Sequence, residues 1–223
     1  MLAAAAVLVA GAVAGCGSGS GPGGSDPAAG AGSAVVVESR SDDGGPYAGI
    51  EVVPPFALPP VTLTRDDGTQ VQLTDDLDRP VRLFFFGYTR CPDICSLVMA
   101  DLTLAVARLP AEAAEQVQVV LVTSDPARDT PVALRAYLDR FDPGFTGLTG
   151  DLDTITRVAE QMGVAVEDGP RLPSGGYEVR HGAQVTGFVG SDGVVVWPQG
   201  TSVDDLAGDL ARLVAAAGTG TRQ

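Results

Sequence analysis

An apolar, aromatic run over residues 81–86 leads directly into a turn with two cysteines, and this junction constrains the fold more than any other stretch. Such a run is typical of a buried strand, and Pro92 suits the first position of a helix, where its missing N–H costs nothing. We therefore expect Cys91 just before a helix and Cys95 about one turn into it. Side chains four apart share a helix face, so the two sulfurs can reach each other or a common point.

A structural disulfide is the plain alternative for this cysteine pair. On the chain-entropy model, closing so short a loop contributes only about 2 kcal/mol, against about 4.7 for a 100-residue loop. The positive end of a helix dipole, in contrast, stabilises a thiolate, the form that attacks disulfides and binds metals. The position therefore favours thiol chemistry, metal chemistry or both.

Strands and helices alternate after the cysteine turn, which predicts a largely parallel sheet covered on both faces. A hairpin over residues 61–64 and 70–73 precedes this part, and a second hairpin over 183–189 and 194–197 follows it. With a cysteine pair at the end of a central strand, this is the layout of an α/β thioredoxin-like fold with a central mixed sheet flanked by helices and an N-terminal β-hairpin. The expected alternating elements are strand 81–86, helix 92–108, strand 117–123, helix 131–140, segment 145–148, helix 151–162 and, after the second hairpin, helix 203–216.

The first 49 residues differ from the rest of the chain, and residues 17–32 are almost entirely Gly, Ser, Ala and Pro, so no core can be built beside them. Residues 1–16 are an apolar run of small residues that ends in Val13-Ala14-Gly15-Cys16. This end resembles the lipobox of bacterial lipoproteins, in which the cysteine is lipidated, and the run is far shorter than the roughly 20 residues of a membrane-spanning helix. We expect a lipoprotein signal peptide over 1–16 and a Gly/Ser/Pro tether over 17–49 that reaches roughly 30 Å.

The tether includes residues 34–37, which are apolar enough to pair as an edge strand. A foldable domain over 50–217 and a disordered tail over 218–223 complete the expected organisation. The formal charge of -14 argues against nucleic-acid binding, which needs a basic balance. An acidic surface attracts cations and basic patches on partners, although most such charges are simply solvated and have no partner role.

The chain has one histidine, His181, and no serine elbow, so a Ser/His/Asp hydrolase triad has no support. In a thioredoxin-like fold, its position just before the second hairpin would fall beside the cysteine turn. Two thiolates form a soft pair that favours Cu(I), and an added imidazole lets the site also hold Cu(II). A structural zinc site would want four protein ligands, although catalytic zinc with a bound water stays open.

Four motifs in order resemble the Sco/SenC family, the copper-binding, thioredoxin-like proteins of cytochrome c oxidase assembly. They are residues 86–95 (FGYTRCPDIC), residues 123–131 (TSDPARDTP), residues 148–150 (LTG) and the downstream His181. The resemblance implies that Cys91, Cys95 and His181 are ligands of copper, as Cu(I), Cu(II) or both. It also implies the CuA-bearing subunit of the oxidase as partner. The lipobox-like motif that ends at Cys16 implies a lipid anchor on the extracytoplasmic side of the cell membrane.

Three functions compete for the cysteine pair. The first is a membrane-tethered copper chaperone, and the alternative is a thiol-disulfide reductase that keeps the cysteines of its target reduced, with Cys91 and Cys95 as the redox pair. A peroxidase is the third, but it needs one persistent thiolate, and here a second cysteine lies within reach to close a disulfide. Delivery and reduction need the same thiolates, so both remain open.

Asp125, Arg128 and Asp129 follow the strand at 117–123, at the sheet edge where α/β folds bind ligands. The same residue types also fit a turn that caps the helix near Pro131 through Asp129 or Thr130. We favour the cap, because its geometry alone accounts for these residues. Three large aromatic residues are expected in the core: Trp197, Phe84 and Phe188.

Overall fold

The computed structural model describes residues 45–92, 94–171 and 177–220, with the backbone alone over 167–171 and 177–181. The expected signal peptide and most of the tether, including residues 34–37, lie outside the described residues. So do Asp93 and residues 221–223.

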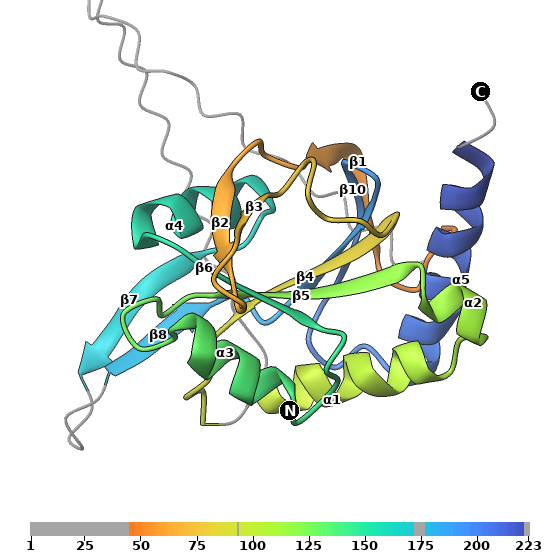
Figure 1. Cartoon of the computed structure of the whole chain (residues 1–223). Helices are drawn as coiled ribbons and strands as arrows, with labels where there is room; N and C mark the ends of the chain where they lie inside the picture. Colours follow the sequence, from red (N-terminus) through yellow and green to blue (C-terminus); the bar gives the residue numbers. More distant parts are fainter. Residues whose placement is uncertain (1–44, 93, 172–176, 221–223) are drawn as a thin grey trace, which may run out of the picture. The chain divides into compact units, whose positions relative to one another are not determined.

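The centre of the fold is an eight-stranded mixed sheet in the order β1-β10-β9-β4-β5-β6-β2-β3 (Figure 1). The pairs β4–β5 and β5–β6 are parallel, and the other pairs are antiparallel. The strands of this sheet are β1 (Ile50–Ala57), β2 (Thr62–Arg65), β3 (Gln70–Gln72), β4 (Val81–Gly87), β5 (Val117–Thr123), β6 (Thr146–Thr149), β9 (Val185–Val189) and β10 (Asp192–Trp197).

Every residue of β4 and β5 is buried, because both strands lie inside the sheet and helices cover it. This burial explains why both strands are mainly apolar, apart from Arg82, Gln118 and Thr123, rather than alternating in pattern. Helix α1 packs against α5, and α3 packs against β6. The helices are α1 (Ile94–Ala107), α2 (Ala111–Ala114), α3 (Pro131–Leu138), α4 (Leu152–Gln161) and α5 (Val203–Gly220).

The expected thioredoxin-like layout is confirmed: parallel β4 and β5, the antiparallel hairpin β9–β10, and a final helix. Three elements were not predicted: the edge strand β1, the short helix α2, and a separate two-stranded sheet of β7 (Val166–Arg171) and β8 (Tyr177–His181). The expected start of the first helix at Pro92 was wrong. The N–H of Cys91 first closes a turn on the carbonyl of Tyr88 at 3.2 Å, so α1 begins at Ile94 and Cys95 lies in its first turn.

The expected core aromatics are confirmed as fully buried. Phe84 and Phe188 meet edge to face, with ring centroids 5.3 Å apart. Trp197 donates its indole N–H to buried Asp209 at 2.8 Å, and the same carboxylate accepts the N–H groups of Ala48 and Gly49 at 2.9 Å. Asp209 therefore fastens the segment before β1 to α5.

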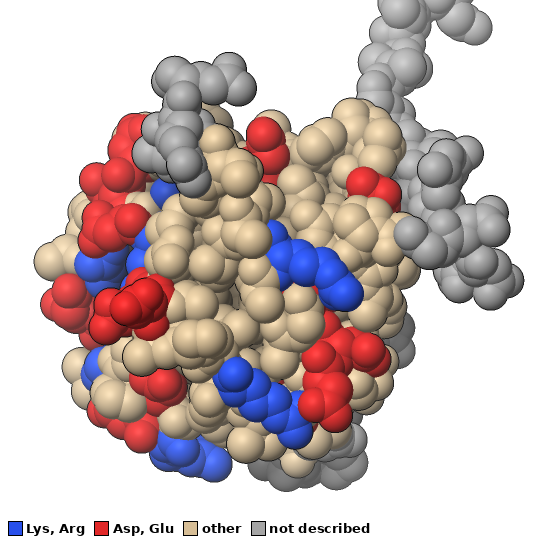
Figure 2. Space-filling model, turned by 90° about the vertical axis from the view of Figure 1, so that its right-hand side faces the viewer, with Lys and Arg blue, Asp and Glu red and all other residues tan. Residues whose placement is uncertain are grey.

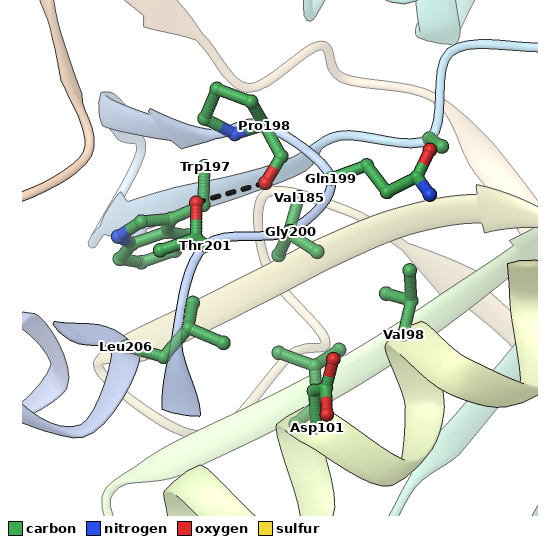
Figure 3. A pocket seen from close by; sticks show the side chains of 11 residues that line it. Val98, Asp101, Val185, Trp197, Pro198, Gln199, Gly200, Thr201 and Leu206 are labelled. Atoms are coloured by element: carbon green, nitrogen blue, oxygen red, sulfur yellow. Dashed lines mark hydrogen bonds between the residues drawn. The ribbon is translucent and has the colours of Figure 1, made fainter. Parts of the chain in front are cut away.

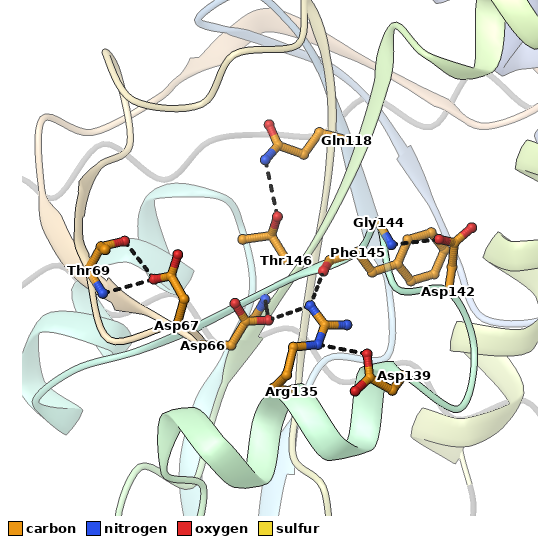
Figure 4. A network of polar contacts seen from close by, with 11 residues as sticks. Asp66, Asp67, Thr69, Gln118, Arg135, Asp139, Asp142, Gly144, Phe145 and Thr146 are labelled. Carbon is orange, nitrogen blue, oxygen red and sulfur yellow. Dashed lines mark hydrogen bonds and ion pairs between the residues drawn. The ribbon is translucent and has the colours of Figure 1, made fainter.

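A second buried carboxylate, Asp66, ties the turn after β2 to α3 and β6 (Figure 4). It accepts the guanidinium of Arg135 and the N–H of Gly147, each at 3.0 Å. Arg135 also donates to the Phe145 carbonyl and to Asp139, each at 2.9 Å. Burial is the main cause that raises the pKa of Asp66, and the bond from Gly147 and the charge of Arg135 oppose it. This cluster holds the β2 edge of the sheet against α3 and β6.

Among the described residues, none of the helices combines the length and the apolar character needed to cross a membrane. Figure 2 shows acidic and basic side chains interspersed on one face of the molecule, separated by uncharged surface. On that face the negative charge is spread out rather than gathered into one patch.

Candidate metal and thiol site

The two cysteines of the turn after β4 lie together, as the sequence predicts. The backbone N–H of Cys95 donates to Sγ of Cys91 at 3.4 Å. Cys91 is half-buried and Cys95 has no exposed surface, and the two residues are thiols rather than a disulfide. Cys91 is therefore the more accessible of the two cysteines, although it also packs against the core.

The environment separates the two thiols chemically. The hydrogen bond to Cys91 and then burial raise the pKa of the Cys95 thiol well above its ordinary value, and the bond to the Tyr88 backbone opposes them. Cys91 is therefore the more accessible of the two cysteines, and Cys95 is the buried one whose thiolate form is disfavoured.

Gly87, at the end of β4, makes room for this pair. A Cβ at this position would come within 3.1 Å of Cys95 Sγ and within 2.8 Å of the Phe85 ring. In the sequence, the only sign of a role for Gly87 is its position before the cysteine turn. The need for a residue without a side chain becomes visible only in the structure, where the Phe85 ring and the Cys95 sulfur occupy the space.

Asp129 braces the cysteine turn from the neighbouring loop. Its buried carboxylate accepts three hydrogen bonds: from the N–H of Thr89 at 2.9 Å, from the Thr89 hydroxyl at 2.6 Å and from the Thr123 hydroxyl at 2.7 Å. The expected helix cap, through Asp129 or Thr130, is confirmed at Thr130, whose hydroxyl accepts the N–H of Ala133 at 3.3 Å. Asp129 therefore supports the cysteine turn, and Thr130 caps α3.

Arg128 adds a second contact between the same two loops. Its guanidinium forms an ion pair with buried Asp125 and lies over the Tyr88 ring, 5.7 Å from the ring centroid. The N–H of Ser124 also donates to the carbonyl of Gly87 at 2.8 Å. The loop at 124–129 therefore sets the position of residues 87–91, rather than serving only as a helix start.

A phenol that the sequence did not flag lies near the thiols. The hydroxyl groups of Tyr137, on α3, and Ser96, on α1, are 3.5 Å apart. Burial, as the main cause, raises the pKa of Tyr137 to about 12, and its charge would also be disfavoured by negative charge on either cysteine. Tyr137 is therefore a neutral hydroxyl that links α3 to the helix carrying Cys95.

His181 is the last residue of β8, opposite Val166 of β7. The N–H of Gly182, the next residue, donates to the carbonyl of Ala165 at 3.1 Å. Its imidazole lies outside the described side chains, so its approach to the cysteines remains a prediction. Within the described part of the chain, no group of three His, Cys, Asp or Glu side chains is placed to hold a metal ion.

Together, the sheet order and the thiol pair at the end of β4 define a thioredoxin-like protein with a Cys-x3-Cys turn. The sequence model described as SCO1/SenC matches residues 54–215. The chain belongs to the SCO1/SenC family.

Individual relatives agree with this assignment. A "putative copper-binding protein" of Stutzerimonas stutzeri is 38% identical over 137 residues, which are 56% of this chain and 64% of that protein. Apo Sco1 of Thermus thermophilus is 31% identical, with a TM-score of 0.67 over 75% of this chain and 96% of that one. Copper-bound ScoI of Bradyrhizobium japonicum is 29% identical, with a TM-score of 0.62 over 70% and 99%. The chain spans about half to two thirds of the length of the curated relatives it matches.

Proposed function

We propose that this protein is a membrane-tethered copper chaperone that binds copper through Cys91, Cys95 and His181 and serves assembly of the CuA centre of cytochrome c oxidase. The observation that carries the proposal is the contact between Cys91 and Cys95 just after β4, with Cys91 half-buried and Cys95 buried. Family membership and the copper-bound relative add support.

The donor set suits copper as cargo. Two adjacent sulfurs are soft ligands that select Cu(I), and an imidazole from the β7–β8 sheet would complete a site that can also hold Cu(II). The half-buried position of Cys91 leaves a path for transfer to a partner, while Cys95 and Asp129 keep the turn in place.

Thiol-disulfide reduction is the second candidate, and the difference between the two thiols favours it. A more accessible Cys91 and a buried Cys95 whose thiolate form is disfavoured match an attacking sulfur and a resolving one. Cys91 would attack a target disulfide and release one target thiolate, and Cys95 would then displace the second and leave a Cys91–Cys95 disulfide.

Copper titration of the reduced chain tests the metal proposal. We expect one tightly bound copper and, with Cu(II), a sulfur-to-copper charge-transfer band. Cys91→Ser or Cys95→Ser should lower Cu(I) affinity more than about 100-fold, since changes outside the ligand set alone cost 10–100-fold. His181→Ala should mainly weaken Cu(II) binding. Equal affinity for zinc and copper, or copper binding unchanged by Cys91→Ser, would contradict the proposal.

We also propose the lipid anchor at Cys16, on the basis of the Val13-Ala14-Gly15-Cys16 motif and the composition of residues 17–49. Cys16→Ala should abolish lipidation and move the protein from the detergent phase to the aqueous phase. Detergent partitioning and mass spectrometry of both forms provide the measurement. Identical partitioning with no lipid mass on the unchanged chain would refute the anchor.

A further inference from the structure

A small hollow lies beside the cysteine helix, between α1, the start of β9 and the loop that joins β10 to α5 (Figure 3). About 280 Å³ of empty space, part of it open solvent, lies between the residues that line it. Val98 and Asp101 of α1 lie below the loop at residues 198–201. Ala183, two residues after the end of β8, also lines the hollow. The hollow therefore adjoins both elements that carry the proposed copper ligands.

The floor of the hollow is apolar and its rim is polar. Four nearly or fully buried side chains form the floor: Val98, Leu102, Val185 and Leu206. At the rim stand exposed Gln199 and the half-buried carboxylate of Asp101. Across the part of the chain that the structure describes, no hydrogen bond or ion pair engages this carboxylate.

The charges around the rim are mainly negative. Asp204 and Asp205 begin α5 next to the loop, and the nearby Arg108 is already paired with Asp204 at 2.6 Å. A ligand for this place needs an apolar stem that fills the hollow and a cation that meets Asp101. Lysine and arginine side chains have this form, because they bury their methylene stem and keep the charged head at the surface.

We propose that the hollow is a docking pocket for one lysine or arginine side chain of a partner polypeptide, with Asp101 as its counter-ion. The partner segment then runs along α1, so that its neighbouring residues pass the turn that carries Cys91. The net charge of -14 adds long-range attraction for a basic segment, and the pocket gives that attraction a fixed position.

An NMR titration of the reduced full chain tests the pocket without copper and without thiol exchange, so its result is independent of the proposed function. The probes are three capped tripeptides with arginine, norleucine or glutamate between two alanines. We expect the arginine peptide to shift the backbone signals of Val98, Ala183 and Thr201 most, and Asp101→Asn to weaken its binding roughly fivefold, because a charged hydrogen bond is about twice as strong as a neutral one.

Asp192→Asn is the matched control, since this exposed aspartate lies at the opposite end of β10 from Trp197, which lines the pocket. Its removal should leave arginine binding unchanged. The proposal is overturned by equal binding of the norleucine peptide, by the absence of shifts around the pocket, or by equal losses in the two aspartate variants. The last result would mean attraction by net charge alone.

Discussion

Replacing Asp129 with alanine is expected to lower the free energy of unfolding by about 3 to 5 kcal/mol. The side chain is completely buried and accepts three hydrogen bonds, two from Thr89 and one from Thr123. Its removal leaves the buried Thr123 hydroxyl and the two half-buried Thr89 donors without this partner, at up to about 1–3 kcal/mol each before relaxation. Urea unfolding of the reduced chain at neutral pH measures the loss.

Thr130→Ala is the control for this prediction, because it changes the adjacent residue and the loop but not the brace. It removes the helix cap on Ala133 and should cost only about 1 kcal/mol. Asp129→Ala should also weaken Cu(I) binding, since the turn that carries Cys91 loses its support, whereas Thr130→Ala should not. Equal losses of stability in the two variants would show that Asp129 is no more than part of a helix start.

The contrast between Asp129 and Thr130 shows where reasoning from sequence reached its limit. Both residue types fit a helix start, and the local pattern alone cannot reveal a partner 40 positions away, as Thr89 is from Asp129. The central strands were easier to predict, because a long apolar run has few alternatives. Strand β5 was predicted with its exact bounds for this reason.

Weak local signals explain the elements that were missed. Strand β1 contains Pro54 and Pro55, and proline normally argues against a strand. The two prolines are tolerated because β1 lies at the sheet edge and its pairing with β10 is irregular. Strand β7 contains Gly169 and Pro170 and pairs only with β8 among the described strands. In both cases tertiary pairing outweighs the local preference.

The structure sharpens the choice between copper delivery and thiol reduction, because it assigns different roles to the two sulfurs. Cys91 is reachable and receives the N–H of Cys95, whereas Cys95 is buried and its pKa is raised by the hydrogen bond to Cys91 and by burial. A reductase would therefore attack through Cys91 and need Cys95 to release its target. Copper delivery would instead need both sulfurs and His181 as ligands.

In cells that lack the unchanged protein, His181→Ala is expected to abolish copper loading of the oxidase, and Cys95→Ser is expected to trap no oxidase subunit. A reductase would behave in the opposite way, since removal of the resolving Cys95 leaves the mixed disulfide on Cys91 intact, and exchange does not require the imidazole. Non-reducing gels and oxidase copper content measure the two outcomes, and Cys91→Ser with Cys95→Ser is the control that cannot trap. Normal oxidase copper in His181→Ala, together with a trapped subunit in Cys95→Ser, would replace the chaperone with the reductase.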